Sequence, residues 1–310
     1  MQVVKNKALV FRTNNPQQIT TVIPKSRDVG DGRVVINWGI DEVQVLKNLN
    51  IKAPSPIEGR YDWSGQHKPF AHQKTTASFL TMHKRAFCFN EQGTGKTASA
   101  IWAADFLMKQ GKVRRVLVVC PLSIMDSAWR ADLFTFAMHR SVDIAYGPKD
   151  KRRQIIEGDA EFIIINYDGV EIVQEAVAQG GFDLIIIDEA THYKNPQTKR
   201  WKVMNALLGP DTWMWMMTGT PAAQSPLDAY GLAKMLNPNS VPRFMGTFKQ
   251  QVMWQVTRFK WVPKDDATET VFNALRPAIR FTKDECLDLP EMTYVKREVP
   301  LTAQQKKYYQ

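Results

Sequence analysis

The chain has 310 residues, of which 44% are hydrophobic and 23% are charged, with a formal net charge of +10 and a pI near 9.4. This composition is that of a globular protein with a full core, and no apolar run approaches the length of a membrane-spanning helix. The positive charge favours a polyanionic partner such as nucleic acid, although ribosomal contacts, acidic lipids or solubility alone explain it too.

The cysteines and the N-terminal residues give information about the cellular compartment of the protein. Cys88, Cys120 and Cys286 lie far apart, with neither paired nor metal-ligand spacing. Cys88 and Cys120 stand in apolar runs, so we expect buried thiols in a reducing compartment. The opening stretch "MQVVKNKALVFRTNN" lacks the apolar core of a signal peptide. The sequence therefore predicts a cytoplasmic protein.

Residues 1–60 are predicted to form a small β-rich appendage. They contain the short β-like runs "ALVF" and "RVVINW", and "GDG" (Gly30 to Gly32) is a hairpin turn signal. The stretch "KAPSPIEG" (Lys52 to Gly59) has two prolines and a glycine, which is typical of a linker. Nothing in this region indicates its function.

Residues 61–237 alternate short apolar strands with amphipathic helices. One helix is expected over "KTASAIWAADFLMKQ", ending at Gly111. Strands too apolar to face water predict an α/β fold with a central parallel sheet between helices. In such sheets ligands gather at the carboxyl ends of the strands. The expected strands are "AFCFN", "VLVVC", "FIIIN", "LIIID" and "WMWMM".

Residues 238–310 are less regular, and we expect a basic and aromatic helical excursion followed by an exit segment. Between Val241 and Lys264 there are five basic residues, no acid and five aromatic residues. This stretch either tracks a nucleic-acid backbone, with Arg258 and Lys260 as contacts, or packs its aromatics on the domain. The final stretch predicts a strand followed by a helix that starts at Thr302.

The stretch "FNEQGTGKTASA" (Phe89 to Ala100) carries the first chemical signal. A strand leads into a loop with Gly93, Thr94 and Gly95, and Lys96 and Thr97 open a helix, which is the context of a phosphate-binding loop. Lys96 is expected to reach the β and γ phosphates of ATP, and the Thr97 hydroxyl to ligate Mg²⁺. One departure is visible, because Asn90 stands where the common pattern has a glycine.

The second signal is "LIIIDEATHYKN", in which an apolar strand ends in Asp188 and Glu189. Alone, this pattern is equally typical of a buried strand that reaches solvent. Together with the upstream loop, it predicts that Asp188 holds Mg²⁺ and that Glu189 polarises the attacking water as general base.

These stretches resemble the first RecA-like lobe of superfamily 2 helicases, in the Swi/Snf-type translocase branch, over residues 66–310. "KPFAHQ" resembles the motif whose glutamine reads adenine, here Gln73, and "EQGTGKT" resembles motif I. "DEATHYKN" resembles motif II, and "MMTGTPAAQ" resembles motif III, which implies a coupling role for Thr218, Gly219 and Thr220. Thr191 stands where many relatives have a histidine, so the coupling role of that histidine is not assigned to His192.

The same resemblance implies DNA contacts. "VLVVCPLSIMDSAWRADL" resembles motif Ia, and "IIINYDGV" resembles the next motif on the DNA side. The residues implied to contact DNA are Pro121, Ser123, Trp129, Asn166 and Tyr167.

The family's second RecA-like lobe supplies arginines that complete the ATP site, and we find no such sheet or arginine motif in this sequence. The resemblance therefore predicts the ATP-binding lobe of an ATP-dependent DNA helicase or translocase, with ATP and Mg²⁺ as cofactors and a second lobe needed for full activity. Two alternative functions remain, a non-hydrolysing nucleic-acid-binding module and the motor part of a restriction or nuclease assembly. RNA is less favoured than DNA as the nucleic acid along which the protein would move. The short head also resembles phage-type helicases, which would place the protein in the host cytoplasm.

Overall fold

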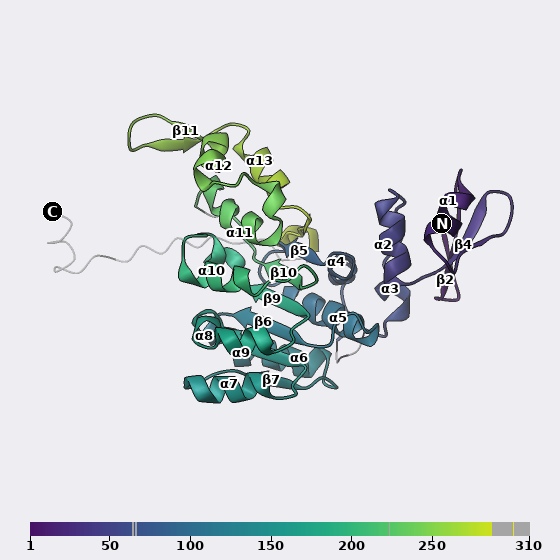
Figure 1. Cartoon of the computed structure of the whole chain (residues 1–310), viewed down its shortest axis with the longest axis horizontal. Helices are drawn as coiled ribbons and strands as arrows, with labels where there is room; N and C mark the ends of the chain where they lie inside the picture. Colours follow the sequence, from purple (N-terminus) through teal and green to yellow (C-terminus); the bar gives the residue numbers. More distant parts are fainter. Residues whose placement is uncertain (64, 66, 223, 287–299, 301–310) are drawn as a thin grey trace.

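The computed structural model describes residues 1–63, 65, 67–222, 224–286 and 300. It contains an N-terminal antiparallel sheet, a large parallel sheet between two layers of helices, and a protruding hairpin (Figure 1). The expected strand and helix of the last stretch of sequence lie outside the described residues. Within those described, no helix combines the length and the apolar character needed to cross a membrane.

The large sheet has seven strands in the order β13-β5-β10-β9-β6-β8-β7, and neighbouring strands are parallel throughout. The predicted α/β fold with a central parallel sheet is confirmed. The strands are β5 (Arg85–Cys88), β6 (Val116–Cys120), β7 (Val142–Ile144), β8 (Phe162–Asn166), β9 (Leu184–Asp188), β10 (Trp213–Met217) and β13 (Ala278–Ile279). Four of the five predicted strands have the expected bounds, and the fifth, β5, begins one residue earlier than expected and ends at Cys88.

Helices cover both faces of this sheet, and the apolar runs explain why. Successive residues of a strand point to opposite faces, so Ile164 and Ile186 join one core cluster while Ile163 and Ile187 join the other. The first face is covered by α4 (Ala71–Thr81), α5 (Lys96–Lys109) and α6 (Ala131–Phe136). The second is covered by α7 (Lys149–Glu157), α8 (Tyr167–Ile172), α9 (Gln174–Gln179), α10 (Lys199–Ala206) and α11 (Ala229–Leu236).

Short helical turns connect several of these elements. A π-helical turn, η2, follows β6 directly after the 3-10 turn η1, and the 3-10 turn η3 follows β9. The turns are η1 (Leu122–Ile124), η2 (Met125–Arg130), η3 (Ala190–Tyr193), η4 (Pro226–Asp228) and η5 (Pro238–Ser240). The predicted end of α5 is also found, since Gly111 adopts a positive φ of 68° just beyond the C-cap residue Gln110.

The N-terminal region forms a four-stranded antiparallel sheet in the order β1-β2-β4-β3. The predicted turn at Gly30 to Gly32 joins the last two strands, and the amide of Arg33 donates to the carbonyl of Gly30. Two helices accompany the sheet, and the predicted linker contains a third short helix. The elements are β1 (Gln2–Val4), β2 (Ala8–Arg12), α1 (Pro16–Val22), β3 (Arg27–Asp28), β4 (Arg33–Asn37), α2 (Ile40–Asn48) and α3 (Ile57–Arg60).

The segment after α11 combines helices with a hairpin that projects from the molecule (Figure 1). The helical excursion expected here is therefore only partly helical. Its last strand, β13, does not extend the hairpin but joins the edge of the large sheet beside β5. The elements, besides β13, are α12 (Met245–Val252), β11 (Met253–Gln255), β12 (Trp261–Pro263), α13 (Ala267–Ala274) and α14 (Lys283–Cys286).

A buried carboxylate, Asp105 of α5, connects Tyr61, which follows α3, to Arg140, which precedes β7. The Tyr61 hydroxyl donates to Asp105 Oδ2 at 2.7 Å, and the Arg140 Nε donates to Oδ1 at 2.7 Å. Burial by itself raises the pKa of Asp105, but hydrogen bonds from Tyr61, Arg140 and His139 outweigh it, so the pKa lies below the ordinary value. The folded cluster thus favours the ionised form of Asp105.

Asp105→Asn is expected to lower the free energy of unfolding by about 1–3 kcal/mol at neutral pH, because it removes the buried negative charge opposite Arg140 and Lys109 and leaves Arg140 with only its more exposed partner Glu161. The folded pKa is depressed, so this contribution is present above the unfolded pKa of about 3.9 and is lost as the pH falls through the folded value. Urea titrations should therefore show the difference from wild type shrinking below about pH 4. The exposed Asp265→Asn is the control, and an equal Asp105→Asn effect at pH 7 and pH 3 would contradict the assignment.

Candidate functional site

The predicted chemical residues meet at the carboxyl ends of three neighbouring strands. In the sheet β10 lies between β5 and β9, so the loop after β5, Thr218 after β10 and the acidic pair at the end of β9 share one edge. The fold thus brings together stretches that are far apart in the sequence, as parallel strands with helical crossovers do.

The loop after β5 turns on two glycines with left-handed backbone. Gly93 has φ of 83° and Gly95 has φ of 77°, a region that side chains rarely adopt. A Cβ on Gly95 would also lie 1.9 Å from Gln73 Nε2, so a larger residue there would have a strained backbone and would displace the Gln73 side chain. Lys96 begins α5, and its largely buried ammonium lies 3.3 Å from the Glu91 carbonyl oxygen. The loop therefore places a lysine and the amino end of a helix at its centre.

Asn90, which departs from the common glycine pattern, has a structural role. Its side-chain Nδ2 donates to the Thr76 hydroxyl of α4 at 2.8 Å. Its side-chain Oδ1 accepts a hydrogen bond from the backbone amide of Phe281 at 3.0 Å. The side chain is fully buried. Asn90 thereby joins the loop to the preceding helix and to the segment after β13, contacts that a glycine would lack.

The helix before β5 supports the same loop. Gln73 Nε2 lies 3.4 Å from the Thr94 carbonyl oxygen, and His72 Nε2 lies 2.8 Å from it. The Gln73 carbonyl oxygen accepts the Phe70 amide at 2.9 Å. Both ends of the Gln73 amide are thus engaged, and its recognition of adenine stays a prediction.

The acidic pair occupies the end of β9 and the turn after it. Asp188 is buried, and its Oδ1 accepts the Glu189 amide at 3.0 Å. Burial raises the pKa of Asp188, while a hydrogen bond from Trp129 and the charge of Lys96 act in the opposite direction. Glu189 has φ of 48° and ψ of 54°, which is a left-handed conformation that few non-glycine residues adopt.

Two neighbours hold the Glu189 carboxylate. The Gln92 amide lies 3.4 Å from Oε1, and the Thr218 hydroxyl lies 3.4 Å from Oε2. Thr218 is itself fixed by its amide, which donates to the Cys88 carbonyl at 3.1 Å, and its hydroxyl accepts the Thr220 amide at 3.3 Å. The contact of Gln92 with Glu189 was not predicted from the sequence, in which the position of Gln92 within the glycine loop is the one indication of a role.

The segment after β10 passes close to the glycine loop at Gly219, where a Cβ would make only ordinary contacts. A Cβ at Gly219 would lie 3.6 Å from the Gln92 amide nitrogen. Beside this segment, a hollow of about 280 Å³ opens between the turn after β9 and the residues after Thr220, lined by Thr191, His192, Lys194, Thr220, Gln224 and Asp228. His192 is exposed, and its ring contacts the Tyr167 ring in a tilted arrangement, with 4.5 Å between the centroids.

Two residues that we expected to contact DNA lie elsewhere. The Trp129 side chain has no exposed surface, and its indole N–H donates to Asp188 Oδ2 at 3.0 Å. The Tyr167 side chain is buried, and its hydroxyl donates to the Asp188 carbonyl at 2.5 Å. Because both side chains face Asp188 and not the surface, the expectation of direct DNA contact is corrected for them.

The other expected contacts on this side lie at or near the surface. Ser123 is exposed, and Pro121 and Asn166 are partly exposed at the ends of β6 and β8. The Asn166 side-chain oxygen, Oδ1, accepts a hydrogen bond from the buried Arg152 guanidinium at 2.9 Å. These positions share an edge with the acidic pair, because β6 lies beside β9 and β8 lies beside β6.

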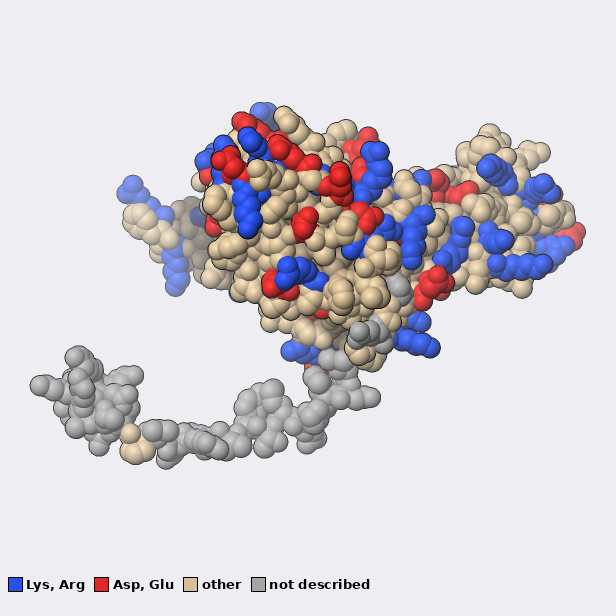
Figure 2. All heavy atoms as spheres, turned by 90° about the horizontal axis from the view of Figure 1, so that it is seen from below, with Lys and Arg blue, Asp and Glu red and all other residues tan. Residues whose placement is uncertain are grey.

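The hairpin of β11 and β12 presents both basic and aromatic side chains. Phe259 is 87% exposed and Trp254 is 60% exposed, while Phe248 of α12 is buried. Packing on the domain therefore accounts for Phe248 but not for Phe259 and Trp254. Figure 2 shows Lys and Arg without Asp or Glu on this protrusion in the view drawn.

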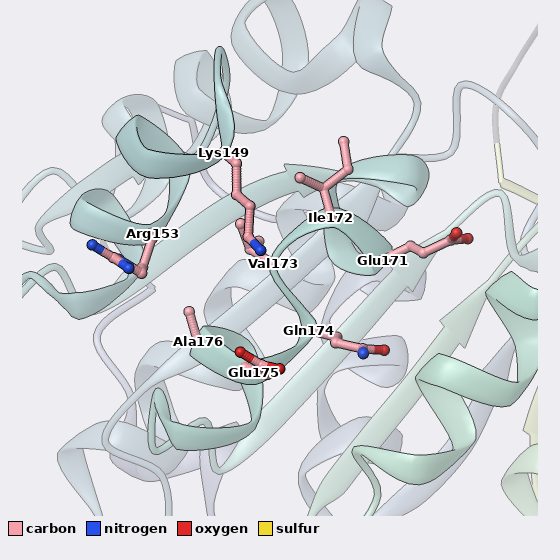
Figure 3. A pocket seen from close by; sticks show the side chains of 8 residues that line it. All are labelled: Lys149, Arg153, Glu171, Ile172, Val173, Gln174, Glu175 and Ala176. Atoms are coloured by element: carbon pink, nitrogen blue, oxygen red, sulfur yellow. The ribbon is translucent and has the colours of Figure 1, made fainter.

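A separate hollow of about 220 Å³ lies beside α7, at the turn between α8 and α9 (Figure 3). It shares no residue with the glycine loop or the acidic pair. The charged ends of Arg153 and Glu171 point in opposite directions in Figure 3, so they do not converge on one ligand position. We assign no chemistry to it.

Comparisons with known proteins agree with this geometry. The chain is 24% identical over 232 residues to the putative ATP-dependent helicase/translocase YwqA of Bacillus subtilis, covering 71% of this chain and 24% of that protein. It is 24% identical over 266 residues to Protein CHROMATIN REMODELING 4 of Arabidopsis thaliana, covering 77% of this chain and 11% of that protein. The chain thus spans about a quarter or less of these relatives.

Solved structures show the same fold. The Sulfolobus solfataricus SWI2/SNF2 ATPase core in complex with dsDNA matches with a TM-score of 0.61 and 23% identity, covering 71% of this chain and 46% of that one. The sequence model of the SNF2-related domain matches residues 72–310, which is most of the chain. The predicted Swi/Snf-type resemblance is therefore confirmed, and the chain belongs to the SNF2-related domain family.

Proposed function

We propose that this chain is the ATP-binding lobe of a DNA-dependent ATP hydrolase, a helicase or translocase whose second RecA-like lobe completes the site. The observation that carries the proposal is the meeting of the glycine loop, the acidic pair and Thr218 at one sheet edge. The named relative from Bacillus subtilis and the dsDNA-bound neighbour support it. The suggestion of a phage-type helicase stays a prediction.

The residues present fit a nucleotide with its metal ion. The loop turns on Gly93 and Gly95 into the start of α5, where the first backbone N–H groups of a helix have no intrahelical acceptor, and it holds the Lys96 ammonium 3.3 Å from the Glu91 carbonyl oxygen. The oxygen donors near it are the Thr97 hydroxyl and the Asp188 carboxylate, which are ligand types that Mg²⁺ prefers. In this proposal Thr97 and Asp188 hold Mg²⁺, which neutralises phosphate charge when bound.

Each of the other residues has a separate task in the proposed reaction. Lys96 and the loop amides hold and orient the phosphates, so that the reacting groups meet in one geometry. Glu189 accepts the proton of the attacking water, and Gln92 and Thr218 hold its carboxylate in position. Thr218, Gly219 and Thr220 connect Glu189 to the segment after β10, which suits a coupling role.

The test is steady-state ATP hydrolysis with and without duplex or single-stranded DNA, using Lys96→Ala as the blank. Turnover that DNA stimulates would support the whole proposal. MgATP binding without turnover would support a lobe that needs its second half. Turnover that DNA leaves unchanged, or the absence of both MgATP binding and turnover, would contradict the proposal. Stimulation of turnover by RNA but not by DNA would identify RNA as the nucleic acid on which the protein acts.

The hairpin supports a DNA contact within the same proposal. Arg258 lies over the exposed Phe259 ring, and Lys264 lies over the exposed Trp254 ring at 4.3 Å. A two-stranded ribbon fits the major groove of duplex DNA, and its cations attract phosphates. We therefore place Arg258 and Lys260 against the DNA backbone.

Reversing Arg258 and Lys260 to glutamate is expected to weaken duplex binding at low salt and to reduce the salt slope by about 1 for each lost phosphate contact. Fluorescence anisotropy over a series of salt concentrations measures both. The control reverses Lys84 and Arg114, which have the same total charge and lie at the amino ends of β5 and β6, away from the hairpin. Equal effects of the two double variants would favour general electrostatics over a hairpin contact.

A further inference from the structure

Asp188 is held by two side chains from outside its own strand. Trp129 belongs to the π-helical turn η2, which follows β6, and Tyr167 is the first residue of α8, which follows β8. Trp129 reaches the carboxylate of Asp188, and Tyr167 reaches its backbone carbonyl. Both come from the part of the sheet edge opposite the glycine loop, since β9 separates β6 and β8 from β10 and β5.

The bond from Trp129 is directed and not merely a consequence of packing. Any large apolar side chain would fill this part of the core, but a buried indole N–H needs an acceptor, and here it is Asp188 Oδ2. The other oxygen, Oδ1, accepts the Glu189 amide. These two bonds fix the rotation of the carboxylate and leave its remaining lone pairs for a cation.

We propose that Trp129 and Tyr167 are positioning residues for Asp188: the indole fixes the orientation of the carboxylate, and the phenol anchors the end of β9. This inference rests on the proposed function, in which Asp188 holds the metal. Groups that hydrogen-bond to a metal ligand in this way typically contribute 10- to 100-fold to metal affinity. The turn that carries Trp129 also presents Asp126 and Arg130 at the surface. The hydrogen bond from the Trp129 indole therefore connects this surface turn to the carboxylate of Asp188, the proposed metal ligand.

The test replaces Trp129 by phenylalanine, which keeps an aromatic ring and removes the donor. The chain offers a matched control in Trp215→Phe, since Trp215 is equally buried and donates its indole N–H to the His83 carbonyl at 3.1 Å, away from Asp188. The readouts are Mn²⁺ binding to the chain with ADP, by electron paramagnetic resonance, and ADP binding in EDTA, by calorimetry. Thermal unfolding verifies that the variants fold.

For Trp129→Phe we expect Mn²⁺ binding about 10- to 100-fold weaker, with metal-free ADP binding unchanged, while Trp215→Phe behaves as wild type in both. Equal Mn²⁺ affinity of the two variants would overturn the positioning role and leave the proposed function intact. A wild-type chain that binds ADP but no Mn²⁺ would overturn both. If Trp129→Phe does not fold, Tyr167→Phe tests the same support of Asp188, with the same two outcomes.

Discussion

Lys96→Ala is expected to abolish measurable MgATP binding, with a loss of at least about 100-fold. The Lys96 ammonium lies at the centre of the glycine loop, and hydrogen bonds to charged groups contribute about 1.5–3 kcal/mol each, so losing contacts to two phosphates removes at least two decades of affinity. The helix itself should persist, because alanine is the best helix former. Anisotropy of a fluorescent ATP analogue measures the loss.

The matched control for this variant is Lys112→Ala, which removes a surface ion pair with Asp41 beyond the other end of α5. It should bind the analogue as wild type does, since such exposed pairs contribute little. Undiminished binding by Lys96→Ala would show that the glycine loop is not where the phosphates lie.

Glu189→Gln should retain MgATP binding while hydrolysis in the active assembly falls by about 10²- to 10⁴-fold, the usual contribution of a general base. Glutamine keeps the size of the side chain and an oxygen that accepts from Gln92 or Thr218, but it cannot take the proton of water. Single-turnover hydrolysis at saturating ATP separates the chemical step from binding.

Glu91→Gln is the control for Glu189→Gln, because Glu91 is a carboxylate of the same loop that accepts the Lys283 amide. Its hydrolysis rate should stay close to wild type. If Glu189→Gln hydrolysed ATP at the wild-type rate, the general base would be another group.

The central strands and the glycine loop were predictable because their signals are local. Strands buried on both faces have uninterrupted apolar runs, and the loop needs glycines at fixed offsets before a helix. Their meeting at one edge also followed, since strands of a parallel sheet end on the same side. Local patterns thus indicated Lys96, Asp188 and Glu189 at this edge, whereas the role of Thr218 was implied only by the resemblance to motif III.

The elements that escaped prediction have weaker local signals. The edge strands β7 and β13 have three and two residues and are only partly buried, so they lack the apolar run of a central strand. Helix α1 did have a signal, since Asn15 caps it and Pro16 opens it. The partners of Trp129 and Asn90 depend on tertiary contacts between distant segments, which no local pattern encodes.

A crystal structure of the chain grown with saturating MgADP is the measurement that tests the proposed site most directly. We predict the β-phosphate within the turn of Gly93 to Thr97, in contact with the Lys96 ammonium, and the metal ion between Thr97 and Asp188. A nucleotide bound at any other place, with the glycine loop unchanged, would contradict the proposed function.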